Sequence, residues 1–383
     1  MTFSNKDQFK RPVIVLGALP ASLYNFRGEL VRTISKDNKV VCMASFAEKS
    51  ERAIIESLGA SFIDYPIKRN SLSVGSDLHT LYSLIKAFRL NSPKLVLAYT
   101  IKPVIWGGIA ARFTNVSSFY AMITGLGYAF QEKGIVKRAL TALVKQLYRF
   151  ALGNVKAVMF QNKDDMSMFI AQGIVNKNKC FLVNGSGVDL KYYAKKPIPQ
   201  GTSFLLVARL LGDKGIREYT KAAAVVKKRY PDSQFHLVGP EDSSPDAINI
   251  EEVQSWQRAG WIQYHGSTSD VRPFLERCSV FVLPSYHEGM PRTVLEAMAI
   301  GRPILTTDVP GCRETVCNGV NGWLVKKGSI EELAERMIWF IENPEHWESM
   351  AEKSHDLAKD KFDVHKVNAD IMKVLELNRE EIV

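Results

Sequence analysis

Cysteine is scarce in this chain and follows no pairing pattern. Only five cysteines occur in 383 residues, and their number is odd. Without paired disulfide or metal-ligand spacing, they indicate reduced thiols of a cytosolic protein rather than a disulfide framework or a zinc site. Cys312 and Cys317 form the only close pair, and nothing around them in the sequence makes them a metal or redox site.

Long apolar runs are also missing. Residues 1–12 lack the apolar core of a signal peptide, and no segment reaches the roughly 20 apolar residues of a membrane-spanning helix. We therefore expect a cytoplasmic protein whose contacts with a membrane are peripheral.

Acidic residues are fewer than basic ones. The sequence has 40 Asp and Glu against 50 Lys and Arg, which gives a formal net charge of +10. We therefore expect an anionic partner: nucleic acid, an anionic membrane surface or a phosphorylated substrate. No run of Lys and Arg with interleaved aromatic residues stands out, so nothing specific supports nucleic acid.

Strand and helix patterns alternate through the first half of the chain. Strand patterns fall at 12–16, 40–44, 61–65, 95–98, 119–123, 157–160 and 181–183, and helical patterns at 24–34, 48–58, 78–90, 104–113, 133–152 and 164–171. Such βαβ alternation predicts an α/β fold with a doubly wound parallel sheet. A length of 383 residues fits two domains of this kind.

A second series of strands follows a predicted linker. The linker, 195–201, contains two prolines and no apolar pattern. Strand patterns then fall at 204–208, 234–238, 262–265, 280–283 and 304–306, and the N-G turns within 318–325 lead to a last short strand. Helical patterns follow at 331–342 and 343–374. We predict an N-terminal domain over 1–195, a C-terminal domain over 196–365 and a terminal helix over 366–383 that packs back on the first domain.

The most informative stretch covers residues 279–301. An apolar run at 280–283 predicts a buried strand. A polar loop with Glu288 follows, Pro291 takes the expected first position of a helix, and Glu296 lies about a turn and a half into it. In open α/β sheets ligands bind at such a junction, because unpaired N–H groups and the helix dipole attract anions. The alternative is that both glutamates are merely solvated.

The spacing of these two glutamates matches a known signature. Glu288 and Glu296 are separated by seven residues within S-x-x-E-G-x-P-x-x-x-L-E-A-M-A. This motif resembles the E-x7-E signature of retaining glycosyltransferases of family 4, whose GT-B architecture has two Rossmann-like domains facing a cleft. The resemblance implies that Glu288 contacts the donor sugar and that Glu296 holds the ribose of the nucleotide. The backbone between them would receive the phosphates, which adds Gly289, Met290, Pro291, Thr293 and Val294 to the implied donor site.

A pair of cations brackets the turn after the strand at 204–208. Arg209 and Lys214 are five residues apart and can both point at one diphosphate, where cations and a helix amino terminus suit the charge on a departing nucleoside diphosphate. The R-x4-K-G element of the family implies this role. The alternative is two surface cations at a helix start. Because two cations are available and no Asp-x-Asp pair occurs, we expect no metal and no cofactor.

Several turns complete the implied donor site. Gly17 ends the first strand in a turn that lacks a full G-x-G-x-x-G, so a plain tight turn is an equal alternative. By resemblance Gly17 faces the cleft, and the nucleotide and its base contact the loops that contain Gly239, Gly266 and Val271.

The acceptor side departs from the family pattern. Many members carry a histidine near the end of the strand at 119–123, where this chain has Thr124 and Gly125. Lys102 follows the preceding strand and either supplies positive charge to the cleft or is solvated at a helix start. The helix at 133–152 is amphipathic and basic, which is typical of helices on an anionic membrane, although such an apolar face more often belongs to a core.

The resemblance also implies a substrate class. The loop at Gly17 and the S-D-V-R-P-F-L-E-R-C stretch at 269–278 look most like enzymes that add N-acetylgalactosamine or a similar hexose to undecaprenyl-diphosphate sugars. The implied reaction moves a hexose or N-acetylhexosamine from a nucleotide sugar, UDP-linked, to a polyprenyl-diphosphate-linked saccharide at the cytoplasmic face of the inner membrane. No residue presents itself as a covalent nucleophile, so same-face substitution is expected.

Two other functional classes remain open at this point. A nucleotide-sugar 2-epimerase shares the architecture and the nucleotide but transfers nothing. A non-catalytic nucleic-acid-binding protein would explain the net charge, but it gives Glu288 and Glu296 no role.

Overall fold

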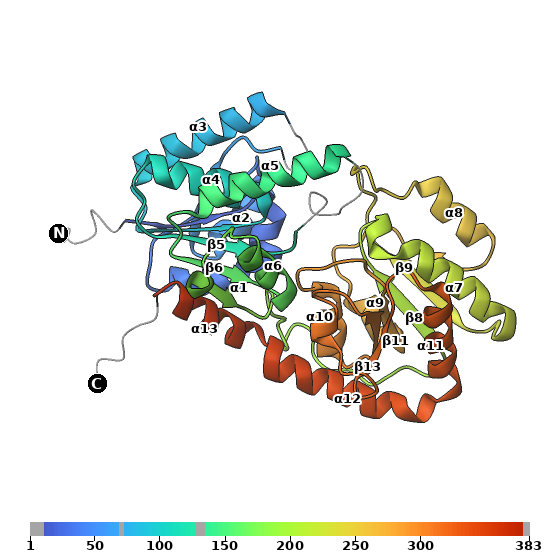
Figure 1. Cartoon of the computed structure of the whole chain (residues 1–383). Helices are drawn as coiled ribbons and strands as arrows, with labels where there is room; N and C mark the ends of the chain where they lie inside the picture. Colours follow the sequence, from blue (N-terminus) through green and yellow to red (C-terminus); the bar gives the residue numbers. More distant parts are fainter. Residues whose placement is uncertain (1–10, 69–72, 127–134, 378–383) are drawn as a thin grey trace. The chain divides into compact units, whose positions relative to one another are not determined.

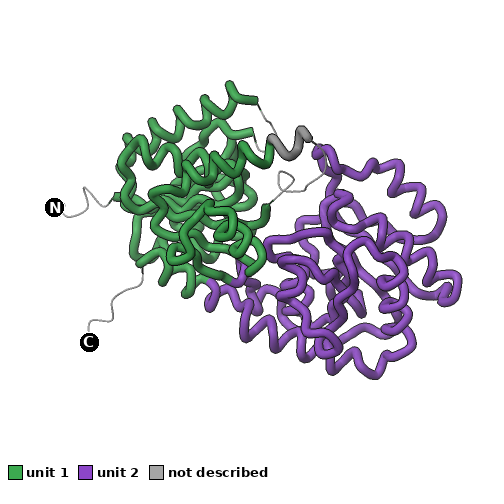
Figure 2. The backbone as a smooth tube through the Cα atoms, in the orientation of Figure 1, with its two compact units in different colours: residues 1–183, 368–383 green, residues 184–367 purple. Residues whose placement is uncertain are grey.

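The chain forms two compact units. The computed structural model describes residues 11–68, 73–126 and 135–377, with side chains in the last range described from residue 140. Unit 1 comprises residues 1–183 together with 368–383, and unit 2 comprises residues 184–367 (Figure 2). Each unit contains its own sheet and its own hydrophobic core.

Unit 1 is built on a seven-stranded sheet in the order β3-β2-β1-β4-β5-β6-β7. Its strands are β1 (Val13–Leu16), β2 (Val40–Ala44), β3 (Ala60–Asp64), β4 (Leu95–Tyr99), β5 (Phe119–Ile123), β6 (Ala157–Phe160) and β7 (Cys180–Leu182). All neighbours in this sheet pair in parallel. Every residue of β1, β2, β4, β5 and β6 is buried, as expected for strands covered by helices on both faces.

Six helices alternate with these strands. They are α1 (Pro20–Ser35), α2 (Lys49–Ser57), α3 (Val74–Asn91), α4 (Ile101–Phe113), α5 (Ile135–Leu152) and α6 (Lys163–Ala171). On one side of the sheet α3 packs beside α4, and α4 packs beside α5 (Figure 1). This alternation, with β1 between β2 and β4, is the predicted doubly wound arrangement.

Unit 2 repeats the scheme with six parallel strands in the order β10-β9-β8-β11-β12-β13. The strands are β8 (Ser203–Val207), β9 (Gln234–Val238), β10 (Gln263–Tyr264), β11 (Val280–Leu283), β12 (Ile304–Thr307) and β13 (Gly322–Val325). The helices are α7 (Ile216–Arg229), α8 (Ile250–Arg258), α9 (Arg272–Arg277), α10 (Arg292–Ile300), α11 (Ile330–Glu342) and α12 (Trp347–Leu357). The prediction of two Rossmann-like domains is confirmed.

Several helix boundaries differ from their predicted positions. α1 begins at Pro20 rather than at residue 24, because proline fits the first turn of a helix, where its missing N–H is not needed. α4 begins at Ile101, so that Lys102 lies in its first turn. Pro291 is the N-cap of α10, with φ −74° and ψ 103°, and not its first helical residue as predicted.

The predicted single helix at 343–374 is wrong. α12 runs on through a π-helical turn at Ala358–Phe362, the chain bends at Asp363 with ψ 127°, and α13 (Val364–Val374) follows. From Asn368 onward the chain belongs to unit 1. There Glu376 lies near Tyr120 of β5, and burial together with this carboxylate raises the pKa of Tyr120 to about 12.

The boundary between the units lies before the predicted linker. We placed the end of the first domain at residue 195, but residues 184–195 group with unit 2. Val188 N donates to Phe362 O at 2.8 Å, and Val364 N donates to Val188 O at 3.0 Å. Tyr193 is buried in a cluster with residues of β8, β11 and α10. Backbone pairing with residues 362–364 and burial of Tyr193 therefore fasten this segment to unit 2.

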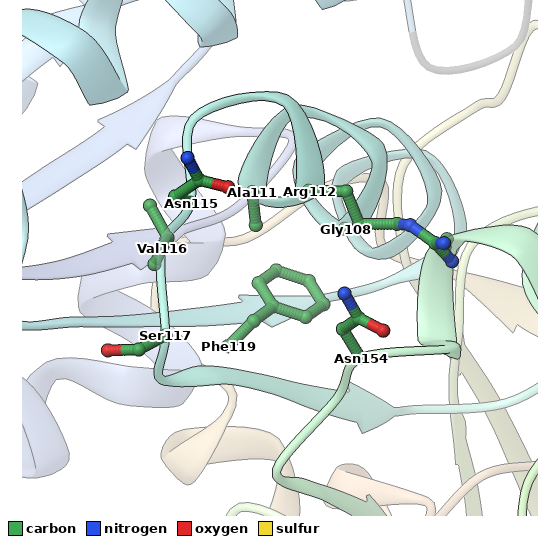
Figure 3. Close-up of a pocket in the computed structure, with 9 residues that line it drawn as sticks. Gly108, Ala111, Arg112, Asn115, Val116, Ser117, Phe119 and Asn154 are labelled. Carbon is green, nitrogen blue, oxygen red and sulfur yellow. The ribbon is translucent and has the colours of Figure 1, made fainter.

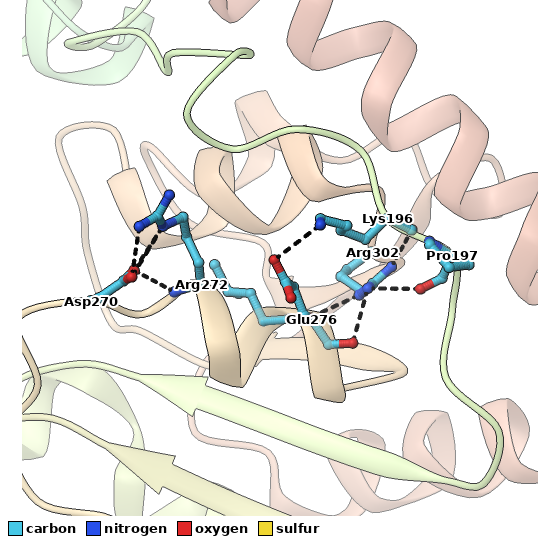
Figure 4. A network of polar contacts seen from close by, with 7 residues as sticks. Lys196, Pro197, Asp270, Arg272, Glu276 and Arg302 are labelled. Atoms are coloured by element: carbon cyan, nitrogen blue, oxygen red, sulfur yellow. Dashed lines mark hydrogen bonds and ion pairs between the residues drawn. The ribbon is translucent and has the colours of Figure 1, made fainter.

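The proline-containing linker itself is held by one buried arginine. Arg302, which is 0% exposed, precedes β12. Its guanidinium donates to the carbonyl oxygens of Lys196 and Pro197 at 3.0 Å each, and also to carbonyls of α9 (Figure 4). Five donors on a rigid plane satisfy several carbonyls that would otherwise be buried unpaired. The segment at 195–201 is thus an ordered part of unit 2.

Candidate functional site

The carboxyl end of the unit 2 sheet gathers most of the predicted donor residues. β8 lies directly beside β11, although β9 and β10 come between them in the sequence. Ligands bind at such topological switch points in open α/β sheets. Arg209 follows β8 and Glu288 follows β11, while Gly239 and Gly266 follow β9 and β10. Positions predicted from four separate segments therefore lie along one edge.

Lys214 and Glu288 form a largely buried ion pair at this switch point. Lys214 Nζ donates to Glu288 Oε1 at 2.6 Å, and Ser285 Oγ donates to the same oxygen at 2.8 Å. Each charged side chain is 16% exposed. Burial opposes the charge on Lys214, but Glu288 and Asp213 outweigh it and raise the pKa of Lys214. The pair therefore places a permanent positive charge beside a carboxylate that two donors orient.

Arg209 is paired with a different carboxylate. Its Nη1 forms an ion pair with Oδ2 of Asp242, whose other oxygen accepts from the backbone N–H of Ser244 at 2.8 Å. Although burial raises the pKa of Asp242, the contacts with Ser244 and Arg209 lower it overall. The Arg209 side chain is 38% exposed, compared with 16% for Lys214. Of the two predicted phosphate-binding cations, Arg209 is the more accessible to an anion.

Two glycines allow neighbouring loops to close around the loop after β11. Gly311 has φ +82°, and a Cβ at this position would lie 2.4 Å from Glu288 O. Gly215 has φ +69°, and a Cβ there would lie 2.1 Å from Pro284 O. Side chains do not fit at either position without moving the backbone that carries Glu288. The loop that presents this carboxylate is therefore held from both sides.

Glu296 is the second buried acid of the site. It is 6% exposed, and Arg292 Nε donates to its Oε1 at 2.9 Å across one helical turn. The hydroxyl of Tyr193 also hydrogen-bonds this carboxylate. Burial raises the pKa of Glu296 despite these donors. A poorly solvated carboxylate of this kind, when ionised, is a strong acceptor for the hydroxyl groups of a ligand.

The amino terminus of α10 lies between the two glutamates in sequence. Val294 N donates to Pro291 O at 3.1 Å in the first turn, and the helix dipole adds partial positive charge at this end. A phosphate group suits such a position. The predicted residues on this turn and the preceding loop are Gly289, Met290, Pro291, Thr293 and Val294.

The loops after β9 and β10 are joined at the same edge. Gly239 N donates to Gly266 O at 2.9 Å. Beside them, His236 Nδ1 and His265 Nε2 lie 3.0 Å apart, and burial lowers the pKa of both rings, that of His236 to about 4. Both imidazoles are therefore neutral at pH 7. Val271, predicted to lie near the base, is the N-cap of the short helix α9.

In unit 1 the corresponding switch point lies between β1 and β4. Gly17 ends β1, and a Cβ there would lie 2.4 Å from the hydroxyl oxygen of Tyr99. That hydroxyl is 2.8 Å from Ser22 Oγ, and Tyr65 Oη donates to Gly17 O at 2.7 Å. The close approach of Tyr99 thus leaves no room for a side chain at position 17, and hydroxyl groups dominate this edge.

The three predicted acceptor residues follow neighbouring strands of unit 1. Thr124 and Gly125 come directly after β5. Lys102 lies after β4, and its Nζ is 2.7 Å from Asp77 Oδ1 of α3. The Lys102 and Asp77 side chains are 14% and 16% exposed. Lys102 is therefore part of an ion pair and not the solvated lysine of the alternative interpretation.

Four residues at these sites escaped the sequence-based prediction. Asp242 and Tyr193 give no local signal, because each reaches its partner only through the fold. Ser285 begins the quoted S-x-x-E-G motif, but the motif does not show that its hydroxyl donates to Glu288. Arg292 could have been found, since its spacing of four from Glu296 on a predicted helix is that of an intrahelical ion pair.

A separate pocket lies at the opposite end of the unit 1 sheet. It has a volume of about 280 Å³ and lies beside the amino end of β5, between the carboxyl ends of α4 and α5 (Figure 3). Its lining residues are Gly108, Ala111, Arg112, Asn115, Val116, Ser117, Phe119, Ala151 and Asn154. None of the predicted site residues lines it.

Two searches of the described part of the chain gave negative results. Among residues 11–68, 73–126 and 135–377, no group of three or more His, Cys, Asp or Glu side chains could hold a metal ion. Over the same ranges, no helix combines the length and apolar character that crossing a membrane requires.

Family comparisons agree with both units. The sequence model of "Glycosyl transferases group 1" matches residues 191–357, and that of "Glycosyl transferase 4-like" matches residues 16–162. A Campylobacter jejuni relative, N,N'-diacetylbacillosaminyl-diphospho-undecaprenol alpha-1,3-N-acetylgalactosaminyltransferase, is 27% identical over 342 residues, which cover 84% of this chain and 87% of the relative. An Escherichia coli relative, UDP-Gal:alpha-D-GlcNAc-diphosphoundecaprenol alpha-1,3-galactosyltransferase, is 27% identical over 74% of this chain and 75% of its own length.

Solved structures share the fold. Anabaena HepE in complex with UDP-glucose superposes with a TM-score of 0.77 at 18% identity, covering 95% of this chain and 99% of HepE. Each of the two glycosyltransferase sequence models matches one unit of the chain. These matches decide against both alternatives, a nucleotide-sugar 2-epimerase and a non-catalytic nucleic-acid-binding protein. The chain belongs to the GT-B glycosyltransferases that combine a 4-like amino-terminal domain with a group 1 carboxyl-terminal domain, and it is a glycosyltransferase.

Proposed function

We propose that this glycosyltransferase moves a hexose or an N-acetylhexosamine from a UDP-sugar to a polyprenyl-diphosphate-linked saccharide, with retention of configuration. The observation that carries the proposal is the Lys214–Glu288 pair, which lies on the same strand edge as Arg209. Support for the substrates comes from the names of the C. jejuni and E. coli relatives, which act on undecaprenol-diphosphate-linked acceptors.

The donor half of the reaction follows from the charges of unit 2. The bond between the anomeric carbon and the diphosphate oxygen breaks, and negative charge develops on the leaving group. Arg209, Lys214 and the amino terminus of α10 stabilise that charge in a partly buried site. Glu288 accepts hydrogen bonds from the donor sugar, and Glu296 accepts them from the ribose. Arg209 exchanges Asp242 for the diphosphate when the donor binds.

The acceptor half follows from same-face substitution. The acceptor hydroxyl attacks the anomeric carbon from the side on which the diphosphate leaves, and its proton passes to the departing phosphate oxygen. No protein nucleophile is then needed. Two cations neutralise the diphosphate, so the proposed reaction needs no metal and no cofactor. Lys102, Thr124 and Gly125 are the proposed acceptor contacts in unit 1.

The proposed location is the cytoplasm, with peripheral attachment to the cytoplasmic face of the inner membrane. The lipid-linked acceptor provides the reason, because its polyprenyl chain stays in the bilayer. The product is a longer lipid-linked saccharide in the assembly of a surface glycan.

Thermal unfolding with a panel of UDP-, GDP- and ADP-sugars tests the donor. Wild type is expected to gain stability with UDP-sugars alone, and Arg209→Ala and Glu296→Ala are expected to lose most of that gain. Arg229→Ala is the matched control, since Arg229 lies at the far end of α7 with a side chain that is 65% exposed. A stabilising GDP- or ADP-sugar would replace the proposed nucleotide, and a panel without any shift would overturn the donor site.

Transfer to a defined acceptor tests the rest of the proposal. An undecaprenyl-diphosphate-linked N-acetylhexosamine is incubated with the stabilising donor, and the anomeric configuration of the product is read by NMR. An α-linked product from an α-linked donor supports retention. Inversion would reject the proposed mechanism, and transfer only to free saccharides would reject the lipid acceptor.

A further inference from the structure

We infer that the exposed face of α3 is a docking surface for an anionic lipid bilayer. The inference deepens the proposed function and rests on it in one respect, since a lipid-linked acceptor gives the enzyme a reason to bind a bilayer. The surface itself follows from the side chains of one helix and not from the substrate.

Large apolar side chains stand exposed along the first half of α3. Val74, Leu78 and Tyr82 are 73%, 57% and 68% exposed. Residues four apart lie one above the other on the same side of a helix, so these three form a continuous stripe across successive turns. Single exposed apolar residues are ordinary on protein surfaces, whereas contiguous apolar patches mark interaction sites.

The second half of the same face is cationic. Lys86 and Arg89 are exposed there, next to Leu90, which is 75% exposed. Asp77 is the only acid on α3, and it is paired with Lys102. The exposed face therefore combines apolar side chains with uncompensated positive charge, which is the composition of helices that lie in the interface of an anionic membrane.

The fold does not need this stripe. The buried residues of α3 are Thr80, Leu84 and Phe88, and the helix packs beside α4. Figure 1 shows α3 at the outside of unit 1. No described residue covers the exposed stripe, because its three members keep more than half of their surface free.

The helix predicted from sequence as the membrane candidate is a weaker one. In α5 the residues Tyr148, Ala151 and Leu152 are buried in the core of unit 1. Its large exposed apolar residues among those with described side chains are Leu143 and Phe150, which lie seven residues apart. The described side chains of α5 thus leave two large apolar residues exposed, whereas α3 leaves four: Val74, Leu78, Tyr82 and Leu90.

A bilayer fits the surface better than a second copy of the chain. In a two-fold dimer through α3, the basic half of one copy would lie against the apolar half of the other, and Lys86 and Arg89 would lose their hydration without gaining a counter-ion. Anionic headgroups instead complement them. The surface also starts beside the proposed acceptor residues, since the Asp77–Lys102 pair joins the first turn of α3 to the first turn of α4. A lipid held there is next to the edge where the acceptor is proposed to bind.

Vesicle flotation with the full-length chain tests the inference. Wild type is expected to float with vesicles of phosphatidylglycerol and phosphatidylcholine and much less with phosphatidylcholine alone. The double variant Leu78→Ser/Tyr82→Ser is expected to bind the anionic vesicles at least tenfold more weakly. Lys86→Gln/Arg89→Gln is expected to lose the preference for phosphatidylglycerol. The matched control, Leu143→Ser/Phe150→Ser on α5, is expected to bind as wild type does.

Three results would overturn the docking surface: no flotation of wild type, equal binding by the α3 variants, or loss of a wild-type dimer in the α3 variants on gel filtration. Transfer to a short-chain, water-soluble polyprenyl-diphosphate saccharide separates this inference from the proposed function. The α3 variants should keep full activity with that acceptor. If neither wild type nor the α3 variants transfer sugar to this soluble acceptor, the proposed function is wrong. The flotation result then still tests the docking surface on its own.

Discussion

The carboxyl ends of the two sheets carry different chemistry, although the strand orders correspond. In unit 2 the loops and the helix start at that edge carry the ion pairs Arg209–Asp242, Lys214–Glu288 and Arg292–Glu296. In unit 1 the same edge carries Lys102–Asp77, Arg52–Asp64 and a group of tyrosine and serine hydroxyls. One scaffold thus supports a charge-dense edge suited to a nucleoside diphosphate and a more neutral edge suited to a saccharide.

The largest expected effect comes from removing a cation of the charge-dense edge. Lys214→Ala should lower kcat by about two to three orders of magnitude, the usual cost of losing a preorganised group that stabilises transition-state charge. It should also lower the free energy of unfolding by about 3 kcal/mol, because Glu288 is left largely buried without its counter-ion. Steady-state kinetics and urea unfolding measure the two effects.

Lys102→Ala is the matched comparison for that variant. Both lysines pair with a carboxylate, and all four side chains are 14–16% exposed. Lys102→Ala should leave UDP-sugar binding unchanged and raise the KM for the acceptor. If both variants lost donor binding equally, the assignment of the donor to the edge of unit 2 and of the acceptor to the edge of unit 1 would be wrong.

The next largest effect concerns Glu296. Its pKa is raised by burial, so the native state binds this proton more tightly than the unfolded chain does. Protonation of Glu296 therefore adds to the free energy of unfolding at low pH, and this contribution is lost as the pH rises through the raised pKa. Ribose hydroxyls need the ionised form, so donor affinity should rise with pH over the same range.

Glu296→Gln should flatten that pH dependence and weaken donor binding by roughly tenfold or more, the range for a hydrogen bond to a charged group. Isothermal titration with UDP between pH 4 and pH 8 measures both properties. An unchanged pH profile in the variant would show that another group titrates.

The smallest expected effect is a gain. In the proposed donor complex Asp242 would compete with the diphosphate for Arg209, and Ser244 holds Asp242 in place through its backbone N–H. Asp242→Asn should therefore tighten UDP binding by about threefold, as expected for a partly exposed ion pair worth less than 1 kcal/mol. Weaker binding in this variant would instead mean that Asp242 orients Arg209 for the donor.

The sequence predicts the layout of this enzyme well and its contacts poorly. Strands such as 40–44, 119–123 and 234–238 were placed correctly, because buried parallel strands are short apolar runs with sharp ends. The E-x7-E and R-x4-K-G motifs identified the candidate residues Glu288, Glu296, Arg209 and Lys214. Which carboxylate each cation meets depends on backbone positions set by distant segments, as for Arg209 with Asp242.

Helix starts and the membrane surface were harder to predict for a different reason. Proline at position 20 reads as a break, although it is compatible with a first turn. The exposed apolar face of α3 could not be identified from the sequence, because a periodic pattern shows amphipathicity but not which neighbour covers the apolar side. Only the packing of the folded chain shows that Leu84 and Phe88 are buried in the core and that Leu78 and Tyr82 are exposed.

The discontinuity of unit 1 sets an order of events during synthesis. Unit 2 is a single stretch, residues 184–367, whereas unit 1 needs residues 368–383 to be complete. A ribosome therefore releases the last piece of unit 1 only after all of unit 2 has been made. Unit 2 can finish folding first on the nascent chain, while unit 1 waits for the residues from 368 onward. Truncation after residue 367 would thus damage the part of the protein that was translated first.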